Sequence, residues 1–178
     1  MKINTYIILF ITLICNSCKK DAVDSVTSST GITYSQSLSN WQSYKQSVHN
    51  NYTYTATSGS VFGFYSETKI TVQNGVVTAR DYMLYTQATG SITYTVTKTW
   101  SETSANLNKH GQYEGAEVLT IDEVYTKAKS VWLVADKGSN SIYFETDSKG
   151  IISTCGFVPK GCQDDCFNGI RIKKMVGL

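Results

Sequence analysis

Alternating apolar and polar positions run along much of the chain and predict an antiparallel β-sheet. Tyr52, Tyr54 and Ala56 alternate with threonines, which is the two-residue period of a strand with one packed and one solvated face. The same period recurs over residues 91–100. The apolar members expected on the packed face of this second strand are Ile92, Tyr94, Val96 and Trp100. The alternation therefore predicts a sheet with a core on one side and threonines facing water on the other.

The clearest turn in the sequence is Asn74-Gly75, which lies between two apolar runs. A type I′ turn needs positive φ at both central residues, and Asn and Gly tolerate that conformation best. The pairs expected across the turn, on one face of the hairpin, are Val72 with Val77 and Ile70 with Ala79. Three further strands are expected over about residues 141–146, 150–157 and 168–175.

Two segments carry a helical period instead. Ser39 and Gln42 fit a capping box, which predicts a helix beginning at Ser39 with Trp41 on its packed face. Thr120 and Glu123 form a second capping box at the start of another helix. The apolar face of this second helix is expected to comprise Ile121, Val124, Tyr125, Ala128, Val131 and Trp132.

The order of these elements predicts an α+β fold. Helix, strands, helix, strands implies two helices packed on one face of an antiparallel sheet of about six to seven strands. Residues 38–178 are expected to form a single domain, and residues 101–117 a long polar loop within it.

The beginning of the chain indicates export and lipid attachment. The apolar run Tyr6–Ile14 is too short to span a bilayer, which needs about 20 residues, but has the length of a secretory h-region. Ser17 directly precedes Cys18, and this junction resembles a bacterial lipobox, in which the cysteine is acylated and begins the mature chain. We therefore expect a lipoprotein signal peptide over residues 1–17, lipidation of Cys18, and a polar flexible tether over residues 18–37. An uncleaved membrane anchor and an ordinary cleavable signal are the alternatives.

The same junction is similar to lipoproteins of the Bacteroidetes type. By that resemblance, Lys19 after the lipidated cysteine implies outer-membrane localisation, facing either the periplasm or the cell surface, because an aspartate there is the usual retention signal for the inner membrane. Asp24, Ser25 and Val26 resemble the short O-glycosylation site of these bacteria, which makes Ser25 a candidate glycosylation residue. The membrane, reached through the lipid anchor, is thus the first expected partner.

Charge and candidate chemistry narrow the function classes. The chain has 16 Lys and Arg against 14 Asp and Glu, so no strong field predicts nucleic acid as a partner. The two histidines, His49 and His110, have no metal-site spacing, and no G-x-S-x-G motif is present, so neither a catalytic residue nor a cofactor is predicted. Asp164 and Asp165 are weak metal candidates, because two adjacent carboxylates lack the alternating ligand spacing of a Ca²⁺ loop.

Apart from Cys18, the expected lipidation site, three cysteines remain in the mature domain, an odd number for an oxidising compartment. By the two-residue period, Cys155 is expected on the packed side of its strand, as a small buried hydrophobic residue. Cys162 and Cys166 flank a tight connection, which favours a disulfide between them. A bridge from Cys155 to Cys166 is the competing possibility.

Several of these features together resemble a family of small exported bacterial proteins classified as a domain of unknown function. The residues that carry the resemblance are Trp41, the segments 52–54, 70–77 and 120–125, and the pair Asp164 and Asp165. The resemblance covers nearly the whole mature chain and implies no catalytic residues.

The favoured function is a non-enzymatic, membrane-anchored binding or interaction domain of the cell envelope, with a protein or a glycan as ligand. An aromatic-rich sheet supports this expectation through Tyr52, Tyr54, Tyr82, Tyr85 and Tyr94. An inhibitor of an exported hydrolase is one alternative, by analogy of fold alone. A hydrolase that uses His110 and the loop carboxylates Glu102, Glu114 and Glu117 is the other. The sequence predicts no oligomeric state.

Overall fold

The structure is a computed structural model that describes residues 22–178 except 61, 89, 91 and 111–113. The predicted signal peptide, the lipidation site Cys18 and its neighbour Lys19 lie outside the described residues. In chain order the elements are a 3₁₀ turn η1 (Ala22–Ser25), α1 (Tyr34–Ser47), β1 (Tyr52–Ser60), β2 (Phe64–Gln73), β3 (Val76–Gln87), β4 (Tyr94–Thr103), α2 (Ile121–Lys127), a π-helical turn η2 (Ala128–Trp132), β5 (Asn140–Thr146), β6 (Ile152–Pro159) and β7 (Asn168–Gly177).

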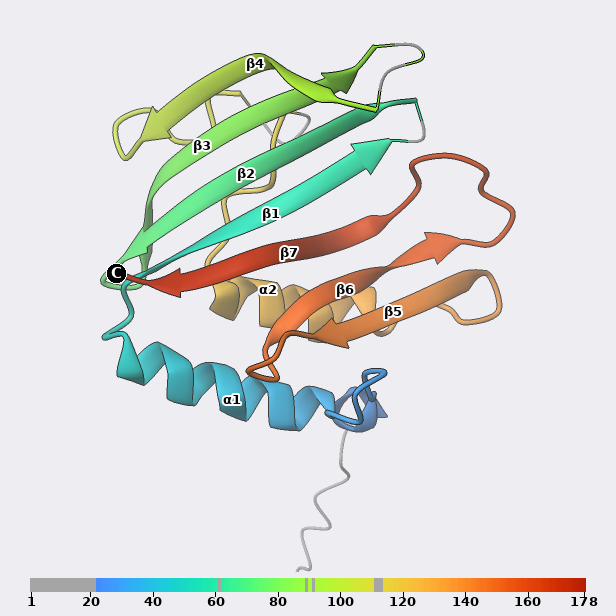
Figure 1. The fold of residues 1–178 in the computed structure, drawn as a ribbon. Coiled ribbons are helices and arrows are strands. Elements are labelled where there is room, and N and C mark those ends of the chain that lie inside the picture. The colour runs from blue at the N-terminus through green and yellow to red at the C-terminus, as the bar shows by residue number, and fades with distance from the viewer. Residues whose placement is uncertain (1–21, 61, 89, 91, 111–113) are drawn as a thin grey trace, which may run out of the picture.

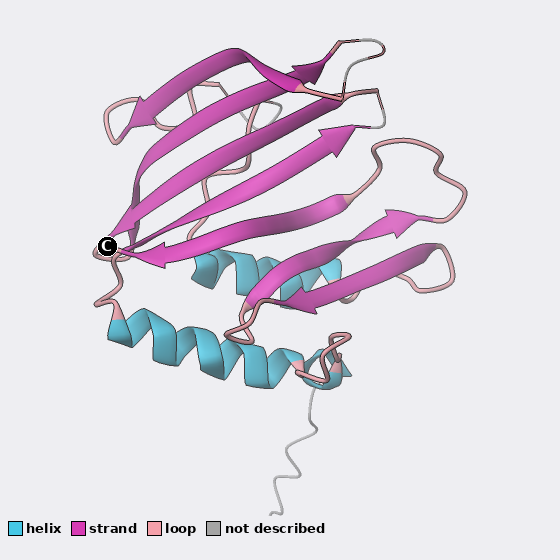
Figure 2. Ribbon diagram, viewed as in Figure 1, coloured by secondary structure: helices cyan, strands magenta, loops and turns pink. Residues whose placement is uncertain are grey.

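The seven strands form one antiparallel sheet in the order β4-β3-β2-β1-β7-β6-β5. The last strand of the chain therefore lies between the first strand and β6. Both helices lie on the same side of this sheet (Figures 1 and 2). The α+β class, with two helices and a seven-stranded antiparallel sheet, is the class that the sequence predicts.

The core fills the space between the helices and the sheet. Tyr52, Tyr54 and Ala56 are all buried on the packed side of β1, as the alternation predicts. Their polar atoms remain bonded, because the Tyr52 hydroxyl accepts from Ile121 N and the Tyr54 hydroxyl donates to Leu119 O. Burying a tyrosine hydroxyl without a partner would be costly, so these bonds fix α2 against β1.

The first helix begins earlier than the sequence predicts. Thr33 is its N-cap, and the capping box forms between Thr33 and Gln36 instead of between Ser39 and Gln42. Tyr34 is almost fully buried, so the first turn packs against the core. The predicted start at Ser39 is wrong because the serines and glutamines of the first turn conceal the helical period.

The flexible tether predicted over residues 18–37 is also wrong from Ala22 onward, and the domain begins before residue 38. Val23 is buried, and Asp24 forms an ion pair with Lys129 at 3.2 Å. Ser29 N donates a hydrogen bond to the Glu145 carboxylate of β5 at 3.1 Å. These contacts join residues that are more than 100 positions apart, so no local periodicity announces them.

The Asn74-Gly75 hairpin has the predicted turn, with φ of 50° and 77°, and Val72 pairs with Val77. Ile70, however, pairs with Arg80 and not with Ala79. A bulge between Thr71 and Val72 in the register leaves one extra residue on β3. A shift of one residue exchanges the two faces of a strand, and it turns Arg80 toward the core.

β4 has only part of the predicted packed face, because Trp100 stacks on the buried Tyr82 but the other three residues do not pack. It is an edge strand, and Ile92, Tyr94 and Val96 are exposed, with Ile92 the most exposed at 94%. A register shift leaves Thr97 as an extra residue on β4, so Tyr94 and Val96 lie on the opposite face of the strand from Trp100. The strand also continues to Thr103, which places Glu102 in a strand and not in the predicted loop.

The second helix begins at the predicted capping box between Thr120 and Glu123. Five of the six residues predicted for its apolar face are buried, but Val131 is exposed. The helix passes into the π-helical turn at Ala128, and wider turns change the direction of later side chains. This change of pitch explains why Val131 leaves the apolar face.

Candidate functional site

The sheet divides between β1 and β7. Their pairing runs from Tyr52 with Gly177 to Ala56 with Ile172 and then stops, although β1 continues to Ser60. A bulge at this point leaves Lys173 as an extra residue on β7. Bulges bend a strand and increase its twist. Beyond the bulge the ribbons of β1 and β7 separate, and the start of β7 pairs with β6 alone (Figure 1).

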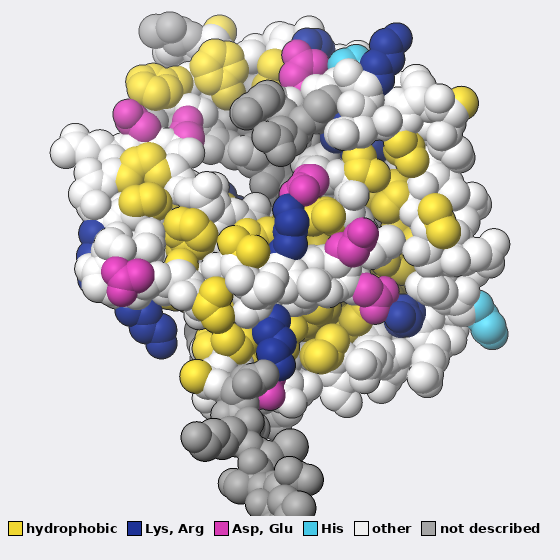
Figure 3. Space-filling model, turned by 180° about the vertical axis from the view of Figure 1, so that it is seen from behind, with side chains coloured by type: hydrophobic (Ala, Val, Ile, Leu, Met, Phe, Trp, Pro, Cys, Tyr) yellow, Lys and Arg dark blue, Asp and Glu magenta, His cyan; other side chains and the backbone are white. Residues whose placement is uncertain are grey.

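A cavity of about 910 Å³ occupies this opening, and we refer to it as the groove. Its lining comes from residues 56–60 of β1, 64–66 and 68 of β2, 82 and 84 of β3, 115–117 and 119 of the connection before α2, Trp132, Val158, the β6–β7 connection from residue 164, and the start of β7 up to residue 171. The surface is visibly hollowed on the side seen in Figure 3. The groove has the size of the larger small-molecule sites, which span roughly 300–1,000 Å³.

One wall of the groove is a strand edge whose backbone has no strand partner among the described residues. Backbone N–H and C=O groups alternate between the two neighbours of a strand. Asn51 O accepts from Leu178 N at 3.0 Å on the β7 side, and Ser60 O accepts from Gly63 N in the turn to β2. Odd-numbered residues of β1 therefore face β7. The antiparallel pairing of Ala56 with Ile172 uses the N–H of Thr57, so the backbone groups that β1 directs into the groove are the Thr57 C=O and the N–H and C=O of Gly59.

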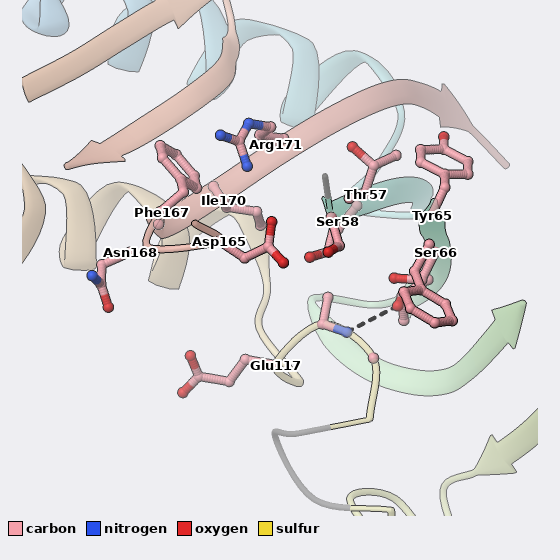
Figure 4. A pocket seen from close by; sticks show the side chains of 18 of the residues that line it. Thr57, Ser58, Tyr65, Ser66, Glu117, Asp165, Phe167, Asn168, Ile170 and Arg171 are labelled. Atoms are coloured by element: carbon pink, nitrogen blue, oxygen red, sulfur yellow. Dashed lines mark hydrogen bonds between the residues drawn. The ribbon is translucent and has the colours of Figure 1, made fainter. Parts of the chain in front are cut away.

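The opposite wall is the connection from β6 to β7. Cys162 and Cys166 form a disulfide in it with their Cα atoms 6.3 Å apart, which fits the predicted bond, while Cys155 is free and buried. Burial raises the pKa of the Cys155 thiol to about 12, so this thiol is not reactive near neutral pH. The Arg171 guanidinium lies 3.7 Å from the centre of the Phe167 ring. Figure 4 shows the Asp165 carboxylate pointing across the groove toward Ser58.

The charged side chains of the groove are mostly acidic. They are Glu117, Asp164, Asp165 and Arg171. Glu117 forms an ion pair with Lys127, whereas Asp164 and Asp165 are exposed and have no ion pair with a described residue. Within the described part of the chain, no group of three or more His, Cys, Asp or Glu side chains could hold a metal ion. Two adjacent carboxylates alone offer a cation few ligands, but they attract a basic group.

A second polar cluster lies under β4, outside the groove lining. Arg80 and Glu102 are both fully buried and form two hydrogen bonds, from Nε to Oε2 at 2.9 Å and from Nη2 to Oε1 at 3.0 Å. His110 Nδ1 lies 3.0 Å from Glu102 Oε1, and the His110 amide donates to the same oxygen. Burial opposes ionisation of Glu102, but the hydrogen bonds from Arg80 and His110 outweigh it and lower the pKa of this carboxyl to about 2.

An aromatic stack encloses this cluster. The Trp100 ring lies between Tyr82, at 5.0 Å, and His110, at 4.2 Å, with nearly parallel planes. His110 thus meets a carboxylate, as the hydrolase alternative requires, but Glu102 already binds Arg80 and neither residue lines the groove. The cluster fastens the 104–110 segment to β4. The sequence did not predict it because Arg80 faces inward only through the β3 bulge.

The other predicted site residues are scattered. Ser25 is exposed in η1, where its hydroxyl donates to Ala22 O, and its glycosylation stays a prediction. Tyr52 and Tyr54 are core residues, whereas Tyr82 is largely buried but lines the groove. Tyr85 and Tyr94 instead gather around Tyr65, at 5.6 and 6.5 Å from its ring. Glu114 pairs with Lys98.

No protein-family model matches this chain, and no curated protein or solved structure is significantly similar to it. Among the described residues, no helix is long and apolar enough to cross a membrane. The groove and the residues around it are therefore the features on which a functional proposal can rest.

Proposed function

We propose that this chain is a non-enzymatic binding domain of the cell envelope, held at the outer membrane by a lipid on Cys18, with the groove between β1 and β7 as its ligand site. The supporting observation is a cavity of about 910 Å³ bordered by the end of β1, which past Ala56 pairs with β2 but, among the described residues, with no strand on its other side. Open backbone groups and two exposed carboxylates can bind a ligand, but they do not form a nucleophile, a base and an orienting acid.

A groove-filling substitution tests this proposal. Ser58→Trp places a large ring where Ser58 faces Asp165, and it should weaken ligand binding by about tenfold or more, the equivalent of 1.4 kcal/mol. Thr99→Trp on exposed β4 is the matched control and should bind as the wild type does. The full chain would be tested on a glycan array and on a displayed random peptide library. If every ligand recovered binds Ser58→Trp as tightly as the wild type, the groove is not the site.

The anchor makes a separate prediction. Mass spectrometry of the protein from its native membrane should find a mature chain that begins at acylated Cys18. Cys18→Ser should leave the membrane fraction, because burial of acyl methylenes, at about 0.8 kcal/mol each, is what holds a lipoprotein in the bilayer. An unmodified Cys18, or a chain that retains Met1, would contradict the proposed anchor.

A further inference from the structure

We infer that the groove binds an extended polypeptide segment, which pairs as an additional strand with the free edge of β1. This inference rests on the proposed function and names the class of its ligand. Four observations support it: the direction of the β1 backbone groups, the small side chains along that edge, the length of the two separated strand ends, and the charge of the opposite wall.

The first observation concerns the spacing of the backbone groups. The C=O of Thr57 and both the N–H and the C=O of Gly59 face the groove, two residues apart along an extended strand. That spacing is roughly 6.6 Å, which is the repeat with which a neighbouring strand offers its own donors and acceptors. Peptides that add to a sheet edge obtain affinity from these backbone bonds. A sugar ring has no matching repeat of donors and acceptors.

The second observation concerns Gly59. Glycine in the interior of a strand costs roughly 0.5–1 kcal/mol relative to alanine, and it often marks a close approach of another backbone. The fold itself does not require it, since a Cβ on Gly59 would meet only Phe64 O at 3.8 Å and Tyr65 Cδ2 at 3.9 Å. With Ser58 and Ser60 beside it, the edge carries small side chains that leave its backbone accessible.

The third observation concerns length. Residues 57–60 of β1 and residues 168–171 of β7 each extend four residues beyond their mutual pairing. Four residues of strand span roughly 13 Å, enough for several backbone bonds to a bound segment. Since β1 and β7 are antiparallel, a segment between them would run antiparallel to one and parallel to the other. Mixed sheets of this kind are common.

The fourth observation concerns charge. Asp164 and Asp165 stand at the groove without an ion pair to a described residue, and Asp165 points toward the β1 edge (Figure 4). The disulfide between Cys162 and Cys166 closes the loop that carries both carboxylates. A segment paired with β1 would place alternate side chains near this wall. The favoured ligand is therefore an extended peptide with Lys or Arg at such a position.

The experiment uses the full chain, a displayed random peptide library and two substitutions at one residue. Gly59→Pro removes the donor that faces the groove but no bond to β2, and strands tolerate proline where the N–H serves no neighbouring strand. Gly59→Ala keeps the donor and adds only a methyl group. Peptides selected on the wild type should be enriched in Lys or Arg. They should bind Gly59→Pro about tenfold more weakly, a loss of 1.4 kcal/mol, and Gly59→Ala nearly as well as the wild type.

Amide hydrogen exchange of the wild type supplies an independent reading. The Gly59 amide should exchange rapidly in the free protein and slow when a selected peptide binds. Because it uses the wild type, this measurement still tests the inference if Gly59→Pro does not fold. Peptides that bind Gly59→Pro as tightly as the wild type, or that leave the Gly59 exchange rate of the wild type unchanged, would overturn the inference.

The outcomes also separate this inference from the proposed function. A glycan that binds the wild type and not Ser58→Trp, with no peptide dependent on the Gly59 amide, overturns the peptide ligand and leaves the groove as a binding site. Failure of both libraries to yield a ligand that Ser58→Trp blocks would overturn the inference and the proposed function together.

Discussion

Glu102→Ala is expected to destabilise the fold by about 3–5 kcal/mol, because it leaves the Arg80 guanidinium buried without its carboxylate. Both side chains are fully buried, so the guanidinium loses its charged partner in an environment of low polarity. The substitution also removes the acceptor for the backbone amides of Asn108 and His110. We expect the 104–110 segment to detach from β4 before the sheet unfolds. Urea unfolding of the variant and the wild type measures the difference in free energy.

A double variant distinguishes the cost of leaving the Arg80 charge unpaired from the cost of lost packing. In Arg80→Met with Glu102→Leu neither charge remains, and apolar replacements of a buried ion pair are often well tolerated. The double variant should therefore be more stable than Glu102→Ala. Single variants that each remain within about 1 kcal/mol of the wild type would show that the pair contributes little.

The same pair predicts how stability depends on pH. The pKa of Glu102 falls from its ordinary value of 4.5 to about 2 in the fold. A lowered folded pKa stabilises the protein above the unfolded value, and that stabilisation is lost as pH falls from about 4.5 toward 2. Its size is roughly 3 kcal/mol at neutral pH. Urea unfolding along this pH range should show the loss in the wild type and a smaller one in Glu102→Gln.

Features with a local physical cause could be predicted from the sequence. Asn74 and Gly75 adopt positive φ because few other residues do so readily, and Thr120 and Glu123 satisfy amides of their own helix. The disulfide between Cys162 and Cys166 likewise joins residues only four positions apart. In each case the interacting groups are close together in the chain, so the local sequence is enough to predict the interaction.

The candidate site could not be predicted, because it depends on non-local pairing. The groove exists because β7, the last strand, pairs with β1 for only part of its length, and the sequence of either strand alone does not reveal where that pairing stops. The buried Arg80 depends on a one-residue bulge in β3. One signal was available, namely that the alternating pattern of β1 ends in Ser58, Gly59 and Ser60, which have little apolar surface to pack.

Trp41→Ala is the second substitution for which we expect a large loss, about 3–5 kcal/mol of folding free energy. Trp41 is a fully buried residue of α1, and its ring packs edge-on against Tyr52 with the ring centres 5.0 Å apart. Its Nε1 donates to Asp122 at 3.2 Å, so one side chain joins α1 to β1 and α2. Removing the ring leaves a cavity where the three elements meet, and α1 should lose its packing first.

Trp41→Phe and Tyr44→Ala are the matched controls. Trp41→Phe keeps a ring in the core but loses the hydrogen bond to the partly exposed Asp122. We expect the lost bond to reduce the free energy of unfolding by about 1 kcal/mol, and the smaller ring to reduce it somewhat further. Tyr44 is partly exposed on the same helix, and its truncation should cost less than that of Trp41. Urea unfolding of the three variants measures the loss in free energy of unfolding for each. A Trp41→Ala loss no larger than that of Tyr44→Ala would contradict the role assigned to Trp41. Neither residue lines the groove, so each variant that folds should retain the ligand binding of the wild type.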